Sequence, residues 1–508
     1  MIESAPEQPG LASQPEDPFP RRFQFSGSLR TRVARGTLIN TAFTVGIGLL
    51  GLLKGFILAG FLSPADYGLW GILIVSLSTL LWLKQVGIGD KFIQQDELDQ
   101  EKAFQKAFTL ELALTGVCVL MIAAATPLLV LIYGLPEMIP PIAVLSLTLL
   151  VSVFQAPLWV YYRKMDFARQ RSLAAVDPLV GFAVSVALAA MGAGYWAFVG
   201  GIAAGTCAAS LVAVASSPFK MRLRYERRSL RSYWSFSAPL MVGGAAGFAS
   251  AWVAVLAAKI HLGVAAVGVI ALAANISQFT DRVDQLITGS LYPAICAVKD
   301  RTSLLYESLV KSNRLALMWA VPFGVGVTLF CADLINFALG ARWRGAITVL
   351  QVYGIAAALN HVGFNWTAYM RALGRTRLIA AESVAAASVF IVSAVPLMAL
   401  FGLAGFAVAV GLQGVAAFVL RAFYLQRIFP GFDFLRHAAR SFLPTLPAAT
   451  VVLVARALES GTRTLGIAVG ELAVYLLVTA LTTWYLEGGL LREAAGYLLG
   501  RRTAAAVS

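Results

Sequence analysis

The chain has 508 residues, of which 59% are hydrophobic and only 13% are charged, and its formal net charge is +14. Soluble domains carry roughly 45–50% apolar and about 25% charged residues, so this composition excludes a soluble protein and indicates a polytopic membrane protein. The basic residues lie in short clusters between apolar segments. This distribution argues against nucleic-acid binding, because it follows the positive-inside rule of membrane proteins.

Residues 1–30 are rich in Pro, Glu, Gln and Ser and contain no apolar signal segment. We expect them to form a disordered cytoplasmic tail. Beyond them, apolar segments of about 20 residues recur, each long enough to cross a bilayer as a helix. The sequence therefore predicts an all-α fold of about fourteen transmembrane helices. The expected spans are 37–62, 67–86, 107–132, 138–160, 173–192, 195–216, 233–258, 264–291, 310–332, 346–370, 378–401, 404–426, 441–457 and 465–486.

Lysine and arginine gather in alternate loops between these spans. One set of loops holds most of the 40 basic residues, including the clusters 220–231 and 371–377. The other set holds only Lys259, Arg342, Arg344, Arg456 and Arg463. Because basic loops remain in the cytoplasm, the pattern predicts an even number of spans with both termini cytoplasmic.

A long internal repeat divides the chain into two similar halves. Asp177 and Glu382 lie at matching positions early in the fifth helix of each half. Both halves begin on the cytoplasmic side, so we expect parallel repeats with a substrate site between them. Three residues at the first turn of one half also recur at the first turn of the other: Leu62, Ala65 and Gly68 match Leu262, Ala265 and Gly268.

The repeat and the spans together predict the domain organisation. We expect an N-lobe of helices 1–6 over residues 31–218 and a C-lobe of helices 7–12 over residues 232–430, joined by a basic cytoplasmic linker at 219–231. Two further helices occupy residues 431–490, and residues 491–508 form a cytoplasmic tail.

Several short motifs occur in the order found in a known family of bacterial transporters. They are Arg35-Gly36-Thr37, Leu62-Ser63-Pro64-Ala65-Asp66-Tyr67-Gly68-Leu69-Trp70, Gly87-Ile88-Gly89-Asp90, Leu291-Tyr292-Pro293-Ala294, Gly340-Ala341-Arg342-Trp343 and Gly374-Arg375-Thr376. Over residues 30–430 the chain resembles the O-antigen and exopolysaccharide flippases of the multidrug/oligosaccharidyl-lipid/polysaccharide exporter superfamily. The resemblance implies a V-shaped transporter of the bacterial inner membrane. It also implies that the transporter flips a polyprenyl-diphosphate-linked oligosaccharide by alternating access, among membrane lipids and other polysaccharide-assembly proteins.

The eighth span contains an unusual polar segment. At about 100° per residue, its polar side chains fall on one half of the helical wheel, whereas Phe279, Val283, Leu286 and Ile287 fall on the other. A half-polar helix within a bilayer should face water or other protein. The polar residues are Asn275, Ser277, Gln278, Asp281, Arg282, Asp284, Gln285 and Thr288.

Lys54 and Arg282 are the basic residues that lie deepest inside the expected spans, where charges are costly and usually functional. A lipid diphosphate needs cations along its route, so these two are candidate substrate ligands. Alternatively, Lys54 extends to the membrane interface and Arg282 forms a structural ion pair. Further cavity candidates are Asn40, Gln278 and Gln285, and candidates for coupling to protons or sodium are Asp281 and Asp284.

Four other polar residues at membrane depth have simpler interpretations. His361 and Asn365 are one turn apart and are expected to be satisfied interior residues, or else to line the same cavity. Asp177 and Glu382 are expected to form ion pairs at the cytoplasmic interface.

Two other functions remain open for the chain, namely a drug or small-molecule antiporter of the same superfamily and a membrane-embedded glycan polymerase or ligase. The loops expected outside the cytoplasm are short, which disfavours a polymerase. The sequence contains no nucleotide-binding, metal-binding or hydrolase motif, so we expect neither catalysis nor a cofactor.

Overall fold

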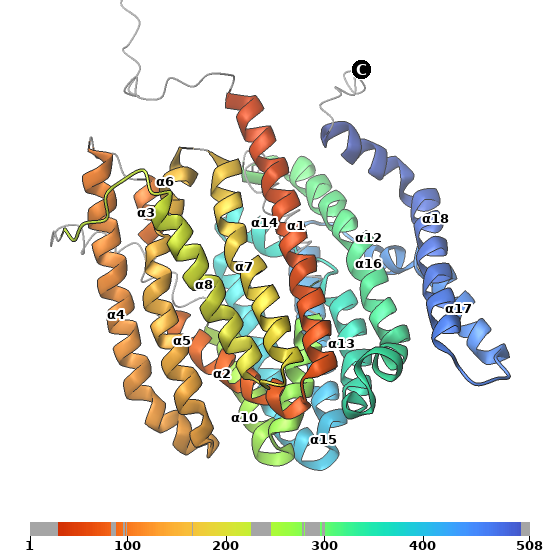
Figure 1. Ribbon diagram of the computed structural model, residues 1–508. Helices are drawn as coiled ribbons and strands as arrows, with labels where there is room; N and C mark the ends of the chain where they lie inside the picture. Colours follow the sequence, from red (N-terminus) through yellow and green to blue (C-terminus); the bar gives the residue numbers. More distant parts are fainter. Residues whose placement is uncertain are drawn as a thin grey trace, which may run out of the picture.

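The computed structural model describes residues 29–82, 88–94, 97, 99–164, 166–224, 245–276, 279, 295–296 and 300–498. Within these ranges every regular element is a helix, as the apolar segments predict. The helices form two lobes, α1–α8 and α10–α16, with a separate hairpin of α17 and α18 at the C-terminal side (Figure 1). The fold class expected from the sequence is therefore confirmed.

Fewer long spans are continuous than the sequence predicts. In the described part of the chain, 8 helices are long and apolar enough to cross a membrane, or up to 9 if the bent pair Phe434–Phe442 and Leu446–Leu458 is one span. The difference has three causes. One long helix contains two expected spans, the tenth span is broken in its middle, and some expected spans extend into residues outside the description.

The local sequence accounts for the helix ends of the N-lobe. Asp99 caps α4 by accepting a hydrogen bond from the Lys102 backbone N–H, and Lys102 holds the pKa of Asp99 below its usual value. The fourth span is interrupted at Val153–Gln155, just before Pro157 begins α6. The helices are α1 (Leu29–Phe61), α2 (Pro64–Trp82), α3 (Ile88–Gln94), α4 (Gln100–Tyr133), α5 (Ile139–Ser152), α6 (Pro157–Arg163), α7 (Phe167–Ala190) and α8 (Trp196–Ala215).

In the C-lobe, α15 is a helical hairpin. It turns at Gly402, whose φ of 61° is readily adopted only by glycine, so the expected turn at Phe401-Gly402-Leu403 is confirmed. The returning half brings Arg421 against Glu382 of the first half. The helices are α10 (Ala245–Leu262), an unlabelled helix (Val264–Ile276), α12 (Thr302–Leu334), α13 (Ala346–Asn360), α14 (Trp366–Ala372), α15 (Thr376–Ile428) and α16 (Phe434–Phe442). The added hairpin consists of α17 (Leu446–Leu458) and α18 (Leu465–Leu498).

The hydrophobic cores show how the two lobes are joined at one end and separate at the other. One core spans both lobes at the end where α1 turns into α2, and it includes Leu58 and Tyr67 of the N-lobe and Ala258 and Trp343 of the C-lobe. We call this the joined end. At the opposite end, the described residues form two separate cores, one among α3, α4 and α6 and one among α12, α14 and α16. The lobes are thus fused at the joined end and independent at the other.

Glycines allow the two lobes to meet at the joined end. A Cβ built on Gly68 of α2 would overlap the Val264 carbonyl oxygen, and one built on Gly268 would overlap the Pro64 carbonyl oxygen. Gly68 and Gly268 are equivalent positions of the internal repeat, so the two matching turns pack against each other with backbone on backbone. Only residues without a side chain permit this separation.

Hydrogen bonds across the lobes reinforce the joined end. The Trp343 indole Nε1–H donates to the Ala59 carbonyl at 2.8 Å, and the Arg342 guanidinium donates to the carbonyls of Ala59, Gly60 and Phe61. These carbonyls belong to the last turn of α1 and have no partner within their own helix. A cation at a helix C-terminus is also favourable for the helix dipole.

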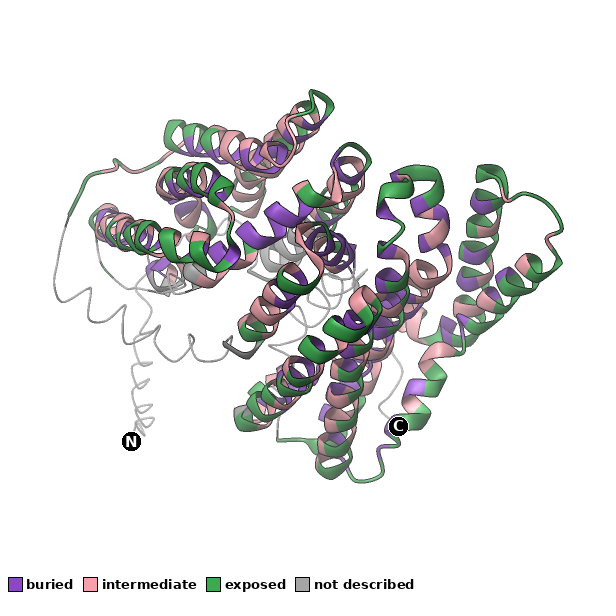
Figure 2. Cartoon of the chain, turned by 90° about the horizontal axis from the view of Figure 1, so that it is seen from below, coloured by how far each residue is buried: buried purple, intermediate pink, exposed green. Residues whose placement is uncertain are grey.

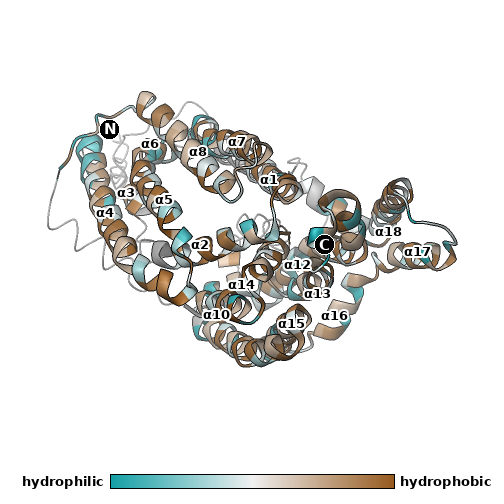
Figure 3. Ribbon diagram, turned by 60° about the horizontal axis from the view of Figure 1, so that its bottom comes forward, coloured by the Kyte–Doolittle hydropathy of each residue, from teal (hydrophilic) through white to brown (hydrophobic). Residues whose placement is uncertain are grey.

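Large apolar side chains cover the outward faces of the helices. Viewed from the joined end, buried residues lie between helices and exposed residues line the perimeter (Figure 2). The perimeter is nevertheless hydrophobic along most of its length (Figure 3). Examples are Leu131, Leu211 and Val392, which are 80%, 72% and 75% exposed. This is the surface that a lipid bilayer requires.

The glycine contact at the joined end makes a specific prediction about stability. Gly68→Ala should lower the thermal midpoint of the purified protein, because overpacking a close contact costs about 1–3 kcal/mol. Gly46→Ala is the matched control, since a Cβ on Gly46 of α1 meets nothing within 4 Å. It should leave the midpoint unchanged or raise it slightly, because alanine favours helix. Equal midpoints for the two variants would contradict the packing described here.

Candidate functional site

Most of the site residues predicted from the sequence lie outside the described residues. Lys54 is described in full, and Asn40 lies in α1 at a position whose side chain is not described. The geometry of the site is therefore built from Lys54 and from the neighbours of the predicted polar segment. Those outside the description are Gln278, Asp281, Arg282, Asp284 and Gln285.

A cavity of about 150 Å³ lies between α1 of the N-lobe and the helix Val264–Ile276 of the C-lobe. Gly51 and Gly55 line it on the α1 side, where their missing side chains leave the space open. Asn275 and Phe279 line the other side, and the Phe279 ring also packs on Trp319 of α12 at 5.7 Å between ring centroids. The described start of the polar segment thus contributes one amide to a cavity that is otherwise lined by apolar residues and glycines.

Lys54 directly precedes Gly55 in α1 and follows Gly51 by three residues, and its ammonium interacts electrostatically with Asp177 of α7. Asp177 also accepts a hydrogen bond from the Thr206 hydroxyl of α8 at 3.2 Å. A Cβ on Gly205 would lie 2.7 Å from the Asp177 carboxylate, so α8 closes over this acid. The described partners of Asp177 thus lie inside the N-lobe, and its place at the cytoplasmic interface stays a prediction.

The ion pair expected for Glu382 exists, but it is buried. The Arg421 Nε–H donates to the Glu382 carboxylate at 2.9 Å, and the two side chains are only 11% and 6% exposed. The first half of α15 brings the acid and the returning half brings the base. The sequence predicted an ion pair for this acid, and the structure identifies Arg421 as its partner.

His361 and Asn365 lie at the break between α13 and α14 and are 1% and 2% exposed. The Asn365 amide donates to the Ser312 hydroxyl at 2.6 Å, and His361 Nδ1 lies 2.7 Å from the Ala357 carbonyl. Asn313 of α12 stabilises the break by donating to the His361 carbonyl and accepting from the Gly363 N–H. His361 and Asn365 are therefore interior residues of a broken span. Their neighbour Asn313 could not be predicted from the periodicity of the sequence.

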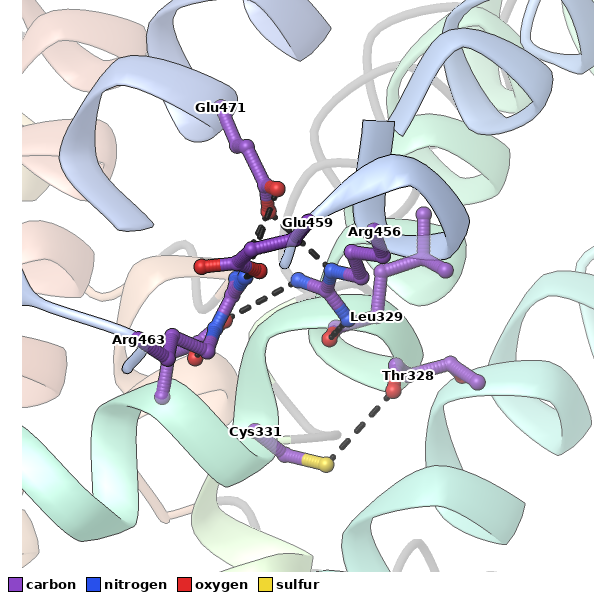
Figure 4. Close-up of polar contacts among 8 residues, drawn as sticks. Thr328, Leu329, Cys331, Arg456, Glu459, Arg463 and Glu471 are labelled. Atoms are coloured by element: carbon purple, nitrogen blue, oxygen red, sulfur yellow. Dashed lines mark hydrogen bonds and ion pairs between the residues drawn. The ribbon is translucent and has the colours of Figure 1, made fainter. Parts of the chain in front are cut away.

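Ion pairs attach the α17–α18 hairpin to α12 at both of its ends. Near the α17–α18 loop, Asp333 and Glu471 each accept from Arg456 and from Arg463, and Glu459 also binds Arg463 (Figure 4). Hydrogen bonds that Arg463 donates to Asp333 and Glu471 raise the pKa of Arg463 further above its usual range. At the opposite end of the hairpin the pairs are Lys311–Glu493 and Arg314–Glu487.

The sequence contained one signal for this network. Arg456 and Arg463 are among the few basic residues expected outside the cytoplasm. Because basic residues are rare on that side, their presence indicates a local structural role. Their acidic partner Asp333 is more than a hundred residues away along the chain, so the pairing itself could not be predicted.

Between the two sets of ion pairs, a largely apolar groove of about 700 Å³ separates α12 from α18. Its wall includes Phe330 of α12 and Leu472 of α18. Leu52 and Phe56 of α1 and Ile276 line both this groove and the cavity between the lobes. A long apolar compartment thus adjoins a smaller compartment that carries polar groups.

The model of the polysaccharide biosynthesis protein family matches residues 57–348, more than half of the chain. The chain belongs to this family. One relative is the lipopolysaccharide biosynthesis protein WzxC of Escherichia coli K12, which is 22% identical over 66% of this chain and 69% of its own length. Another is the probable low-salt glycan biosynthesis flippase Agl15 of Haloferax volcanii, 23% identical over 39% of this chain and 43% of that protein.

Solved structures of similar fold come from transporters of low sequence identity. The lipid II flippase MurJ in an inward closed conformation has a TM-score of 0.65 and 13% identity, covering 89% of this chain and 99% of that chain. An inward-facing MATE multidrug transporter of the MOP superfamily has a TM-score of 0.61 and 14% identity, covering 77% and 98%. These structural similarities show that the chain has the fold of these transporters.

The ion network predicts how the hairpin responds to mutation. Asp333→Asn should loosen the α17–α18 loop, because Asp333 is the α12 carboxylate that binds both Arg456 and Arg463, and without it their ion pairs lie only within the hairpin. Arg456 and Arg463 are themselves trypsin sites, so limited trypsin digestion of the purified protein should cleave there several-fold faster. Glu459→Gln is the control, since Arg463 keeps both Asp333 and Glu471. Equal cleavage rates in the two variants would show that Asp333 does not hold the hairpin.

Proposed function

We propose that this chain is a flippase that moves a polyprenyl-diphosphate-linked oligosaccharide across the bacterial inner membrane for cell-surface polysaccharide biosynthesis. The observation that carries the proposal is the junction of the apolar groove with the cavity between the lobes. A substrate with a long hydrocarbon tail and a polar head needs both compartments side by side. The family and the names of the two relatives support the same assignment.

The proposed sidedness places both termini and the open end of the V in the cytoplasm. The positive-inside rule supports this orientation, because the basic clusters 220–231 and 371–377 lie in loops of the same set as the termini. The substrate head would then enter between the lobes from the cytoplasmic leaflet, while the joined end blocks exit. Transport requires the Gly68 and Gly268 contacts to separate and the opposite end to close, as in alternating access.

Lys54, Arg282, Asn40, Gln278 and Gln285 are proposed to line the path of the head group. In the described state the Lys54 ammonium interacts electrostatically with the Asp177 carboxylate. An incoming diphosphate could replace that carboxylate, so the ammonium would never be left uncompensated in a low-dielectric region. Asp281 and Asp284 are proposed as the coupling residues.

Deletion of the gene should test the function directly. Cells without the chain should accumulate lipid-linked oligosaccharide that is accessible only from the cytoplasmic leaflet, and expression of the chain should reverse the accumulation. The measurement is leaflet-specific oxidation or enzymatic labelling of the glycan in inverted and right-side-out vesicles. Normal leaflet distribution together with increased drug sensitivity would instead support a small-molecule antiporter. Accumulation of unpolymerised glycan on the outer leaflet would support a polymerase.

A double substitution separates the two roles of Lys54. Lys54→Met alone should lower protein abundance and export, because it leaves the Asp177 charge inside the N-lobe. Lys54→Met with Asp177→Asn should restore abundance, since both charges are gone. If Lys54 binds the diphosphate, export by the double variant should stay below about a tenth of the wild-type rate, the loss expected for one charge-assisted contact. Recovery of export along with abundance would show that the pair is structural.

A further inference from the structure

A second cavity, of about 570 Å³, lies within the C-lobe between α10, α13 and the two halves of α15. Among the described residues it shares no lining residue with the cavity between the lobes. Its volume is within the range of about 300–1,000 Å³ typical of ligand sites. Neither the proposed groove nor the proposed head-group path accounts for it.

Loose packing at two glycines of α15 leaves room for the cavity. A Cβ on Gly411 would have its nearest atom, in Val352 of α13, at 3.9 Å, and one on Gly414 would have Asn360 of α13 at 3.6 Å. In the N-lobe, by contrast, Gly201 and Gly205 of α8 press on α7, where a Cβ on either would overlap Ser185 or lie against Asp177. The returning half of α15 thus meets α13 only at ordinary van der Waals distance at these two positions.

Polar groups with unused hydrogen-bonding capacity face this cavity. Arg421 uses its Nε–H on Glu382 and one Nη1–H on the Asn360 carbonyl, and among the described residues its Nη2 has no hydrogen-bond partner. The side-chain amides of Asn360 and Gln413 likewise form no hydrogen bond to a described residue, and Asn360 Oδ1 is buried. Buried donors and acceptors that the protein leaves unmatched point to a ligand or to water.

Aromatic rings form the remaining wall. The rings of Tyr353 and Phe390 lie 6.1 and 6.0 Å from that of Phe406, between centroids. Planar amide, guanidinium and carboxylate groups can each form paired hydrogen bonds with adjacent hydroxyls, while aromatic faces accept the apolar C–H faces of a sugar ring. A hydrocarbon tail would leave Arg421, Asn360 and Gln413 unsatisfied. A cationic drug would be repelled by the Arg421 guanidinium.

From the juxtaposition of the Glu382–Arg421 pair, the Asn360 and Gln413 amides and this aromatic wall, we infer that the C-lobe cavity binds a sugar residue of the transported glycan. The inference rests on the proposed function and adds a second site to it. Gly402, which lies beside Leu262 at the joined end, turns α15 back, so Glu382 and Arg421 lie toward the open end. A glycan whose lipid diphosphate is held between the lobes would bind at this cavity before the lobes close.

Binding of the free glycan tests the site without transport. The probe is the oligosaccharide released by mild acid from the lipid-linked intermediates of the deletion strain, labelled at its reducing end. It is titrated against the full-length protein in lipid nanodiscs. Ala417→Leu fills the cavity and Gln413→Leu removes an amide, and each should raise the Kd about tenfold or more. Val419→Leu on the lipid-facing side of the same helix, where Val419 is 56% exposed, should leave it unchanged.

A parallel assay separates this inference from the proposed function. Proteoliposomes are loaded with a polyprenyl diphosphate carrying one sugar or the full glycan, and flipping of both is measured. The cavity variants should lose the preference for the full glycan while still flipping the one-sugar lipid. Unchanged Kd in both variants, or no binding by the wild type, would overturn the sugar site while flipping continues. Absence of flipping by the wild type would overturn the proposed function itself. Gln413→Leu adds no bulk, so it remains informative if Ala417→Leu fails to fold.

Discussion

Contact between two backbone turns at the joined end determines the shape of the molecule. Gly68 and Gly268 bring the first turn of each lobe against the other, closer than any side chain would permit. That contact allows one hydrophobic core to form across both lobes, and the other end remains as two separate cores. The V, the cavity between the lobes and the access to it all follow from this asymmetry.

The sequence predicted the elements of this fold better than their contacts. Apolar periodicity predicted the helices, and the repeat identified Gly68 and Gly268 as equivalent. The repeat alone could not predict that Gly68 and Gly268 are in contact, because it shows that two positions correspond but gives no distance between them. Asp177 and Glu382 illustrate the same limit. They match in sequence, but Thr206 and Lys54 surround one and Arg421 pairs with the other, and these partners come from helices whose approach is set by packing.

For the candidate site, sequence reasoning can single out an anomalous residue but cannot predict a pair. Lys54 was proposed because a charge inside an apolar span is unusual, and its role stays a prediction. The Asp333 network and the C-lobe cavity were not predicted, since both depend on residues brought together from distant segments. Nothing in the sequence distinguishes Asn360 and Gln413 from other polar residues. They become candidate ligands only because they line the C-lobe cavity.

The two sets of ion pairs between α12 and the C-terminal hairpin have a consequence for the surrounding bilayer. Arg314 and Asp333 are separated by about 28 Å along the helix at 1.5 Å per residue. That length is close to the hydrocarbon thickness of a membrane, about 30 Å. Each charged cluster therefore lies near one water interface and fixes the vertical position of the protein. In lipids with shorter or longer acyl chains the hairpin cannot slide to compensate, so the bilayer must thin or thicken around it. The C-terminal hairpin thus makes the acyl-chain length of the host membrane a variable to which this protein is sensitive.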